Sequence, residues 1–185
     1  MGKKVIKVTL TREGISDAIR ELRDYQKWME QKQKEFLDAL AQEGLKVASI
    51  GFDKAEYDGT NDVECSIADI GTKKKAIVAT GHKDPTTGTD VVLFIEFGTG
   101  ILNPDDHPEG PQNGMVHGQY GYGRGNNIWG WTYEGDPGSH GQRIYTGWQS
   151  GRIHTFGNPA NKALFHSKTE LEERFAEIAR RIFTR

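Results

Sequence analysis

The longest regular pattern in the chain is the spacing of apolar side chains over residues 13–43. They recur every three or four residues, as on one face of a helix, at Ile15, Ala18, Ile19, Leu22, Met29, Phe36, Leu37 and Leu40. Thr11 stands before the segment as a capping residue, and Gly44 either ends the helix or marks a weak point before residues 45–48. The pattern predicts one long helix over 13–43. The sequence leaves open whether this helix bends at the polar stretch 30–34.

A second helical pattern follows Asn158-Pro159-Ala160 and continues to the last residue. One face of it carries Leu164, Leu171, Phe175, Ile178 and Ile182. Asn158 is a good N-cap residue, and a proline is tolerated in the first turn of a helix. We therefore predict a C-terminal helix that begins near residue 158. Ser167 followed by Glu170 leaves open a second helix start at that point.

Four shorter segments have the character of strands. Residues 5–10 and 63–68 alternate apolar and polar side chains, and residues 76–80 form a short apolar run. Val91–Phe97 is the longest apolar run, and we predict that it forms a central strand buried on both faces. The short connections between these segments favour an antiparallel sheet.

These elements predict an α+β fold in which a small, mostly antiparallel sheet packs against a long N-terminal helix and a C-terminal amphipathic helix. The length of 185 residues suits one domain, 1–185. Residues 99–157 are a Gly/Trp/Tyr-rich insertion between the last predicted strand and the C-terminal helix. This insertion holds three of the four tryptophans, so we expect it to carry most of the aromatic contact surface.

Composition narrows the range of partners. The net charge of −2 gives no positive field, so we expect no specific nucleic-acid recognition. No apolar stretch approaches the roughly 20 residues that cross a bilayer, and the N-terminal apolar segment is too short for a signal peptide. A single cysteine, Cys65, excludes an intrachain disulfide. We expect a soluble chain that is neither exported nor bound to a membrane.

Candidate catalytic chemistry is sparse. The six histidines lack the tight spacing that is typical of structural zinc sites, although His107 directly follows Asp105-Asp106. Cys65 lies in an alternating segment, where a cysteine is usually a small buried residue. We predict no catalytic residue, no metal and no cofactor, and hence no enzyme. A metal-assisted hydrolase built on the histidines of the insertion is kept as an alternative.

Aromatic residues alternate in two segments of the insertion. The segments 127–133 and 143–148 have the pattern of two strands, and they flank the turn residues 135–138, so they could form a hairpin. Their aromatic side chains are Trp129, Trp131, Tyr133, Tyr145 and Trp148. Such a group serves as internal packing, as a protein interface or as a carbohydrate platform, and the sequence leaves these three roles open.

Two short motifs are similar to a known family. Phe94-Ile95-Glu96-Phe97-Gly98-Thr99-Gly100 resembles the hydrophobic–Glu-Phe-Gly-Thr-Gly signature of siphophage tail-completion proteins, encoded by phages and prophages of Gram-positive bacteria. Gly157-Asn158-Pro159-Ala160, with Phe165 five residues later, resembles the element that opens the C-terminal helix of that family. The family more often has a second proline before this phenylalanine, where Ala163-Leu164 stand here, and the insertion is long for the family.

The resemblance implies a structural virion protein of the phage neck or tail end, which joins or completes the tail at the head–tail interface. It implies a ring-like homo-oligomer in contact with neighbouring neck and tail proteins, located in the virion and synthesised in the cytoplasm of the host bacterium. No catalytic residue is carried over. The motif residues are Glu96, Phe97, Gly98, Thr99, Gly100, Asn158, Pro159 and Ala160.

The five aromatic residues named above are the candidate assembly interface. A glycan-binding module built on Trp129, Trp131 and Trp148 is the other alternative.

Overall fold

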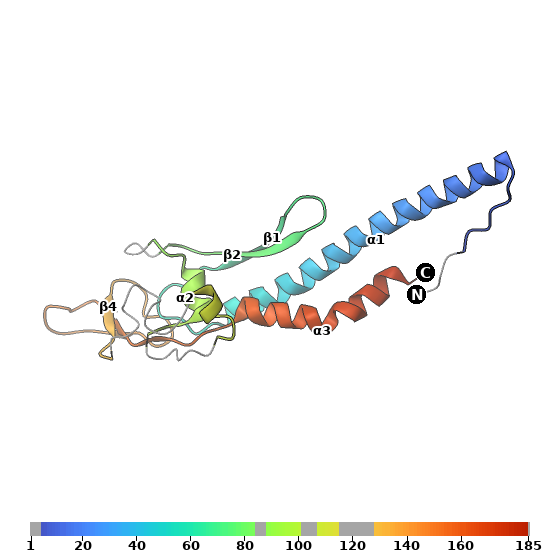
Figure 1. The fold of residues 1–185 in the computed structure, drawn as a ribbon. Coiled ribbons are helices and arrows are strands. Elements are labelled where there is room, and N and C mark those ends of the chain that lie inside the picture. Colours follow the sequence, from blue (N-terminus) through green and yellow to red (C-terminus); the bar gives the residue numbers. More distant parts are fainter. Residues whose placement is uncertain (1–4, 84–87, 101–106, 115–127, 185) are drawn as a thin grey trace.

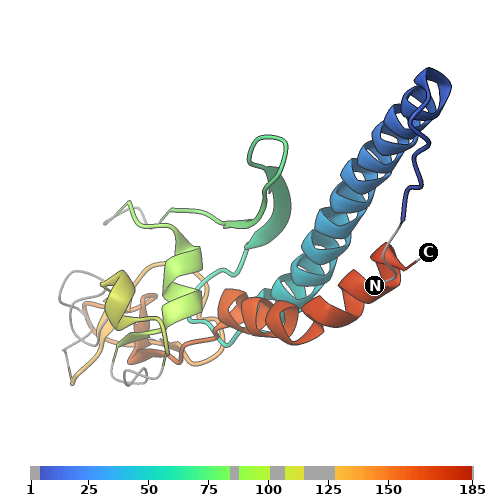
Figure 2. The ribbon, with the colours of Figure 1, turned by 45° about the vertical axis from the view of Figure 1, so that its right-hand side comes forward.

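The computed structural model describes residues 5–83, 88–100, 107–114 and 128–184. It has an α+β fold with a long N-terminal helix, a C-terminal helix and small antiparallel sheets, which confirms the predicted fold class. Figures 1 and 2 show that the first half of α1 (Arg12–Asp53) projects away from the rest of the molecule. The short strands of the insertion gather at the opposite end. No helix in the described ranges combines the length and the apolar character needed to cross a bilayer.

Helix α1 is longer than the sequence predicts. Thr11 caps it as expected, because its side chain accepts a hydrogen bond from the backbone N–H of Gly14 at 3.1 Å. The helix continues through 30–34 and past Gly44, so the predicted end near residue 43 is wrong. Gly44 is buried, and a Cβ atom at this position would meet the side chains of Ile77 and Leu171. The glycine therefore allows close packing inside the helix and does not end it.

Helix α3 (Ala163–Phe183) packs along the second half of α1. The predicted start at residue 158 is wrong, because Asn158 belongs to a short strand and Lys162, with φ 60°, occupies the N-cap position. The open alternative of a second start at Ser167 is also wrong. Ser167 lies inside the helix, where its buried hydroxyl donates to the carbonyl oxygen of Gly44 at 2.8 Å. This bond fixes the two helices to each other.

Strands β1 (Glu64–Asp69) and β2 (Lys75–Thr80) form the predicted antiparallel hairpin, with Glu64 opposite Thr80 and Asp69 opposite Lys75. Both strands contact α1. Lys75 forms ion pairs with Asp38 of α1 at 2.8 Å and with Asp69 at 2.7 Å. The ion pairs and the half-buried strands hold the hairpin along one side of the helix (Figure 1).

The run Val91–Phe97 forms helix α2, so the predicted central strand is wrong. The side chain of Asp90 caps this helix by accepting from the backbone N–H of Val92 at 3.0 Å. Five of its seven residues are buried, and Val91, Val92 and Ile95 pack with Phe52 in the core. A continuous apolar run has no polar face to show its period, so a buried helix turn and a buried strand look alike.

The remaining strands are short. β3 (Thr99–Gly100) pairs with β7 (Gly157–Asn158), and β6 (Ile153–Thr155) lies between β4 (Trp131–Tyr133) and β5 (Gln142–Arg143). A 3-10 turn spans Pro111–Asn113. The predicted hairpin of the two aromatic segments is therefore wrong, because β4 and β5 each pair with β6. Residues 5–10 form no strand in the described structure, contrary to the prediction.

Candidate assembly surface

The carboxylate of Glu96 caps helix α3. Glu96 is only 3% exposed, at the end of α2, and its oxygens accept from the backbone N–H groups of Leu164 at 2.9 Å and Phe165 at 3.0 Å. These N–H groups belong to the first turn of α3, whose own N-cap residue provides no side-chain cap. A carboxylate at this end of a helix is also favoured by the helix dipole. Glu96 therefore does for α3 what a local capping residue usually does.

Backbone bonds reinforce the same junction. The N–H of Asn161 donates to the carbonyl oxygen of Ile95 at 2.9 Å, and the N–H of Lys162 donates to that of Glu96 at 3.1 Å. The end of α2 and the start of α3 thus satisfy each other's free backbone groups. The Asn161 side chain extends the junction to α1, because its Nδ2 donates to the Gly51 carbonyl oxygen at 3.0 Å.

His107 completes the environment of Glu96. Its imidazole is buried between the rings of Phe97 and Phe165, at centroid distances of 4.3 and 5.6 Å. The backbone N–H of Glu109 donates to Nδ1 at 3.1 Å, so in the neutral ring the proton lies on Nε2. Nε2 is 3.3 Å from Oε1 of Glu96 and donates to it. Both nitrogens are therefore engaged within the fold, which argues against His107 as a metal ligand.

The other parts of the alternative metal site stay a prediction. Asp105, Asp106 and His117 lie outside the described residues. Elsewhere, His82 pairs with Asp62 at 2.9 Å and His140 with Glu56 at 3.1 Å. Within the part of the chain that the structure describes, no three histidine, cysteine or acidic residues come together as a metal site.

The two motif segments, about 60 residues apart, meet at Asn158. This residue is 1% exposed, and its Nδ2 donates to the Phe94 carbonyl oxygen at 3.1 Å, while its Oδ1 accepts from the Thr99 hydroxyl at 2.7 Å. Residue 99 is also its partner in the β3–β7 pair. Pro159 and Ala160, half-buried, continue from there to α3. The motif residues thus form one structural junction.

Two glycines of the junction have no room for a side chain. Gly100 has φ 67°, and a Cβ atom on it would overlap the carbonyl oxygen of Phe156. Gly157 has φ 105°, and its Cβ atom would overlap the carbonyl oxygen of Thr99. Gly98, with φ 76°, ends α2. The glycines of the first motif are therefore explained by the turn out of α2 and by the close approach of β3 and β7.

A second junction ties the strands of the insertion to the segment after α1. The buried carboxylate of Asp58 accepts from the backbone N–H of His140 at 2.6 Å and from the hydroxyl of Thr155 in β6. Next to it, the N–H of Ser139 donates to the carbonyl oxygen of Tyr57 at 2.9 Å. These bonds fix the β4–β6–β5 sheet to the helical body.

The five aromatic residues of the candidate interface fall into two groups. Trp131 and Tyr133 are half-buried in β4, opposite Thr155 and Ile153. The hydroxyl of Tyr133 donates to the carbonyl oxygen of Asp136 at 2.7 Å, and burial, together with the negative charge of Asp58, raises the pKa of Tyr133 well above its usual value. These two residues serve the packing of the sheet.

Trp129, Tyr145 and Trp148 form the exposed group, with 79%, 80% and 89% of their surfaces accessible. Tyr145 and Trp148 lie on the loop 144–151, which joins β5 to β6. We call this segment the aromatic loop.

The aromatic loop is held by its own hydrogen bonds. The N–H of Ile144 donates to the Arg152 carbonyl oxygen and the N–H of Gly151 to that of Ile144, both at 2.8 Å. The Ser150 hydroxyl donates to the carbonyl oxygen of Tyr145 at 3.0 Å. A loop with a fixed backbone therefore presents two large, exposed aromatic side chains. Aromatic groups of this kind lose little conformational freedom when they are covered, which is typical of protein interfaces.

Several residues of the site are not evident in the sequence. A buried glutamate after an apolar run needs a partner, but nothing in the sequence indicates that the partner is the first turn of the last helix. The roles of Asp58 and His107 have no local signal, because their partners lie far away along the chain.

Comparison with known proteins gives no relative from which a role can be transferred. No family model matches the chain, and no curated protein and no solved structure matches it either. The resemblance of the two motifs to tail-completion proteins accordingly stays a prediction from the sequence.

Proposed function

We propose that this chain is a structural protein of a phage virion, which joins or completes the tail at the head–tail interface through contacts with copies of itself and with neck or tail proteins. It acts in the virion after synthesis in the bacterial cytoplasm, without enzymatic activity and without a cofactor. The two motifs, which resemble those of tail-completion proteins, support this proposal. Their residues are occupied in holding the fold together, as in a protein whose role is mechanical.

One observation carries the assembly role. Tyr145 and Trp148 are 80% and 89% exposed on the hydrogen-bonded aromatic loop, although Trp131 and Tyr133 of the same insertion are half-buried. Large aromatic side chains on a preorganised loop gain most from being covered by a partner, since little entropy is lost on binding. A ring would then multiply contacts that are individually weak.

Deletion of the gene in its bacterial host tests the virion role. After induction of phage production, we expect heads and tails to form but to remain unjoined in negative-stain electron micrographs. A plasmid copy of the wild-type gene should restore joined particles, and mass spectrometry of purified particles should detect the protein. Fully joined, infectious particles from the deletion strain would contradict the proposal.

The exposed tryptophans also favour a second candidate, a glycan-binding surface. Trp129 and Trp148 are accessible enough to stack on sugar rings, whereas Trp131 is half-buried. Titration of the intrinsic tryptophan fluorescence with bacterial cell-wall oligosaccharides separates the two functions. The assembly role predicts no saturable change in the fluorescence, and a saturable change that is lost in Trp148→Ser supports the glycan role.

A further inference from the structure

The segment 5–10, which we call the N-terminal arm, has the sequence of a strand but pairs with none. Its apolar and polar residues alternate, and Ile6, Val8 and Leu10 share one side of an extended chain. The described structure leaves Val8 50% exposed and Leu10 95% exposed, and residues 5–10 adopt no strand there. The strand prediction is therefore wrong for one copy of the chain by itself. The alternation of apolar and polar side chains that led to it still suits a strand.

Strand β2 offers an edge for such a segment. In the described structure its sheet contains only β1 and β2, so one side of β2 has no strand next to it. A free edge carries backbone N–H and carbonyl groups that can pair with another chain. Two-stranded sheets are also weakly stable by themselves, so a third strand would stabilise this one.

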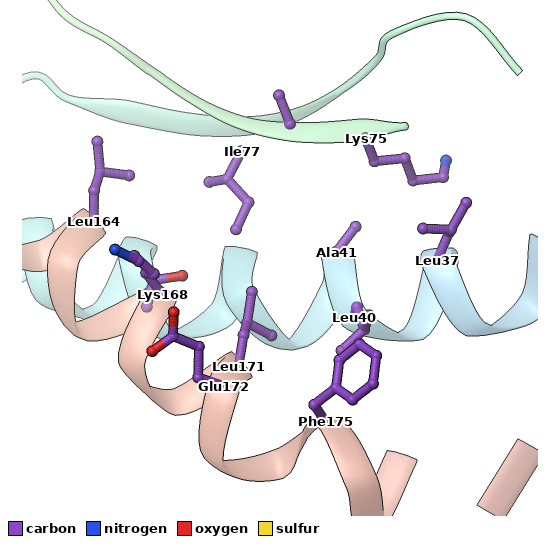
Figure 3. Close-up of a pocket in the computed structure, with 12 residues that line it drawn as sticks. Leu37, Leu40, Ala41, Lys75, Ile77, Leu164, Lys168, Leu171, Glu172 and Phe175 are labelled. Carbon is purple, nitrogen blue, oxygen red and sulfur yellow. The ribbon is translucent and has the colours of Figure 1, made fainter. Parts of the chain in front are cut away.

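An apolar groove lies beside that edge. Its volume is about 480 Å³, and its lining comes from α1, β2 and α3 and includes no residue of β1, so it lies between the two helices and the β2 side of the hairpin. Figure 3 shows Ile77 of β2 above the groove, with Leu37 of α1 and Leu171 and Phe175 of α3 around it. Phe175 remains 53% exposed. The side chains of an added strand would cover these groups.

The arm of the same chain cannot reach this groove. Leu37 lies about 25 residues along α1 from Arg12, a distance of roughly 38 Å at 1.5 Å per residue. Val8 lies only four residues before Arg12, which gives a reach of about 14 Å even for a fully extended chain. An arm that enters this groove must therefore belong to another copy of the chain.

The charges of the arm and the groove are complementary. Residues 1–12 carry four basic residues and no acidic one. Of the charged residues that line the groove, Lys75 and Lys168 already form ion pairs, with Asp38 and Asp69 and with Glu109 respectively. Glu172 also lines it, and its charge, after the hydrogen bond from Glu109, helps to raise the pKa of Lys168. The two lysines and the four acidic groups beside them, Asp38, Asp69, Glu109 and Glu172, carry a net charge of −2, whereas the arm is positive.

We propose that the N-terminal arm of a second copy adds as a third strand along the free edge of β2 and places Ile6, Val8 and Leu10 in the groove. Main-chain hydrogen bonds to the strand edge would supply affinity, and the pocket would select the apolar side of the arm. This inference deepens the proposed function, since it names one contact between copies, and it rests on that function only in the claim that the chain self-associates.

Light scattering across a concentration series tests this contact with the full chain. We expect the wild type to form a species larger than a monomer and Val8→Asp/Leu10→Asp to associate at least about tenfold more weakly, because charged groups would enter an apolar groove. The matched control is Val5→Asp/Thr9→Asp, with the same charge change on the other side of the arm, which should associate nearly as the wild type does.

Mixing two variants tests the groove itself. Phe175→Asp places a charge in the groove and leaves the arm unchanged. Val8→Asp/Leu10→Asp places charges on the arm and leaves the groove unchanged. Each should be monomeric alone, and the mixture should give a 1:1 heterodimer. Hydrogen exchange of the wild type should show protection of residues 5–10 and 75–80 that increases with concentration, a readout that does not depend on the variants.

The outcomes separate this contact from the proposed function. A wild type that stays monomeric throughout the series, or an arm variant that associates as tightly as the wild type, overturns the inference. If the arm variant associates normally but changes to the aromatic loop prevent particle assembly, the inference fails and the proposed function stands. If the arm variant dissociates but the gene deletion leaves joined particles, the contact stands and the proposed function fails.

Discussion

The carboxylate of Glu96 accepts a hydrogen bond from the backbone N–H of Leu164 at 2.9 Å, although the two residues lie 68 positions apart in the sequence. This bond joins the end of α2 to the first turn of α3. The two ends of the insertion between these helices are therefore fixed to each other. The motif residue thus has a structural role that requires no chemistry of its own.

The first prediction concerns this cap. Glu96→Ala removes two hydrogen bonds to a helix N-terminus and leaves Nε2 of His107 without its acceptor, so we expect a loss of about 2–4 kcal/mol in the free energy of unfolding. Urea denaturation followed by circular dichroism measures this loss. Glu109→Ala, which removes only the ion pair with Lys168 on the surface, is the control. A loss below about 0.5 kcal/mol for Glu96→Ala would contradict the capping role.

The second prediction concerns the close approach of β3 and β7. Gly100→Ala adds a Cβ atom that overlaps a backbone oxygen at a positive φ, so we expect a loss of more than about 2 kcal/mol. Gly71→Ala is the matched control, because its φ of 68° is nearly the same but no atom lies within 4 Å of the added Cβ. The control should lose only about 1 kcal/mol from its strained backbone. Equal losses for both variants in urea denaturation would show that the contact is unimportant.

The third prediction concerns the apolar face of α3. The pattern in the sequence favours a buried Phe175, but this side chain is 53% exposed, whereas Ile178 is 1% exposed. We expect Ile178→Ala to lose about 2–4 kcal/mol and Phe175→Ala about 1 kcal/mol, since only the former leaves a cavity in the core. Thermal and urea unfolding of the two variants give the comparison, and the reverse order would contradict the assignment of the core.

The fourth prediction is a pH dependence at Tyr133. Its pKa is raised in the folded protein, mainly by burial, so the unfolded chain releases this proton at a lower pH. The contribution of Tyr133 is therefore fully present below about pH 10, the ordinary tyrosine pKa, and is lost as the pH increases above it. Tyr133→Phe should lower this alkaline loss of stability relative to the wild type in urea titrations at pH 9 and pH 11. Identical losses would mean that the Tyr133 hydroxyl is solvated in the folded state.

The two long helices were predictable from local patterns because their apolar spacing continues over many residues, although the end of α1 and the start of α3 were not. The strands of the β1–β2 hairpin were predictable from their short alternating or apolar segments. The helical conformation of Val91–Phe97 was not predictable, because a continuous apolar run does not show whether its period is that of a helix or of a strand. Asp90, which caps this helix, was a usable signal of a helix start. The cap of α3 by Glu96 was beyond local reasoning, since it depends on contacts between distant segments.

The candidate interface was predictable only as a group of aromatic residues. Burial divides that group, because Trp131 and Tyr133 belong to a strand in a sheet while Tyr145 and Trp148 lie on a loop. Strand pairing with β6, which the alternating pattern does not specify, decides this division.

The most direct test of the central claim is particle assembly with a changed aromatic loop. Tyr145→Ser/Trp148→Ser alters two exposed side chains, so its unfolding free energy should match that of the wild type within about 0.5 kcal/mol. Thr146→Ser in the same loop is the control. When each variant replaces the wild type in the phage-producing host, we expect joined particles from the control and unjoined heads and tails from the double variant. A normal yield of joined particles from the folded double variant would contradict the claim that the aromatic loop is an assembly surface.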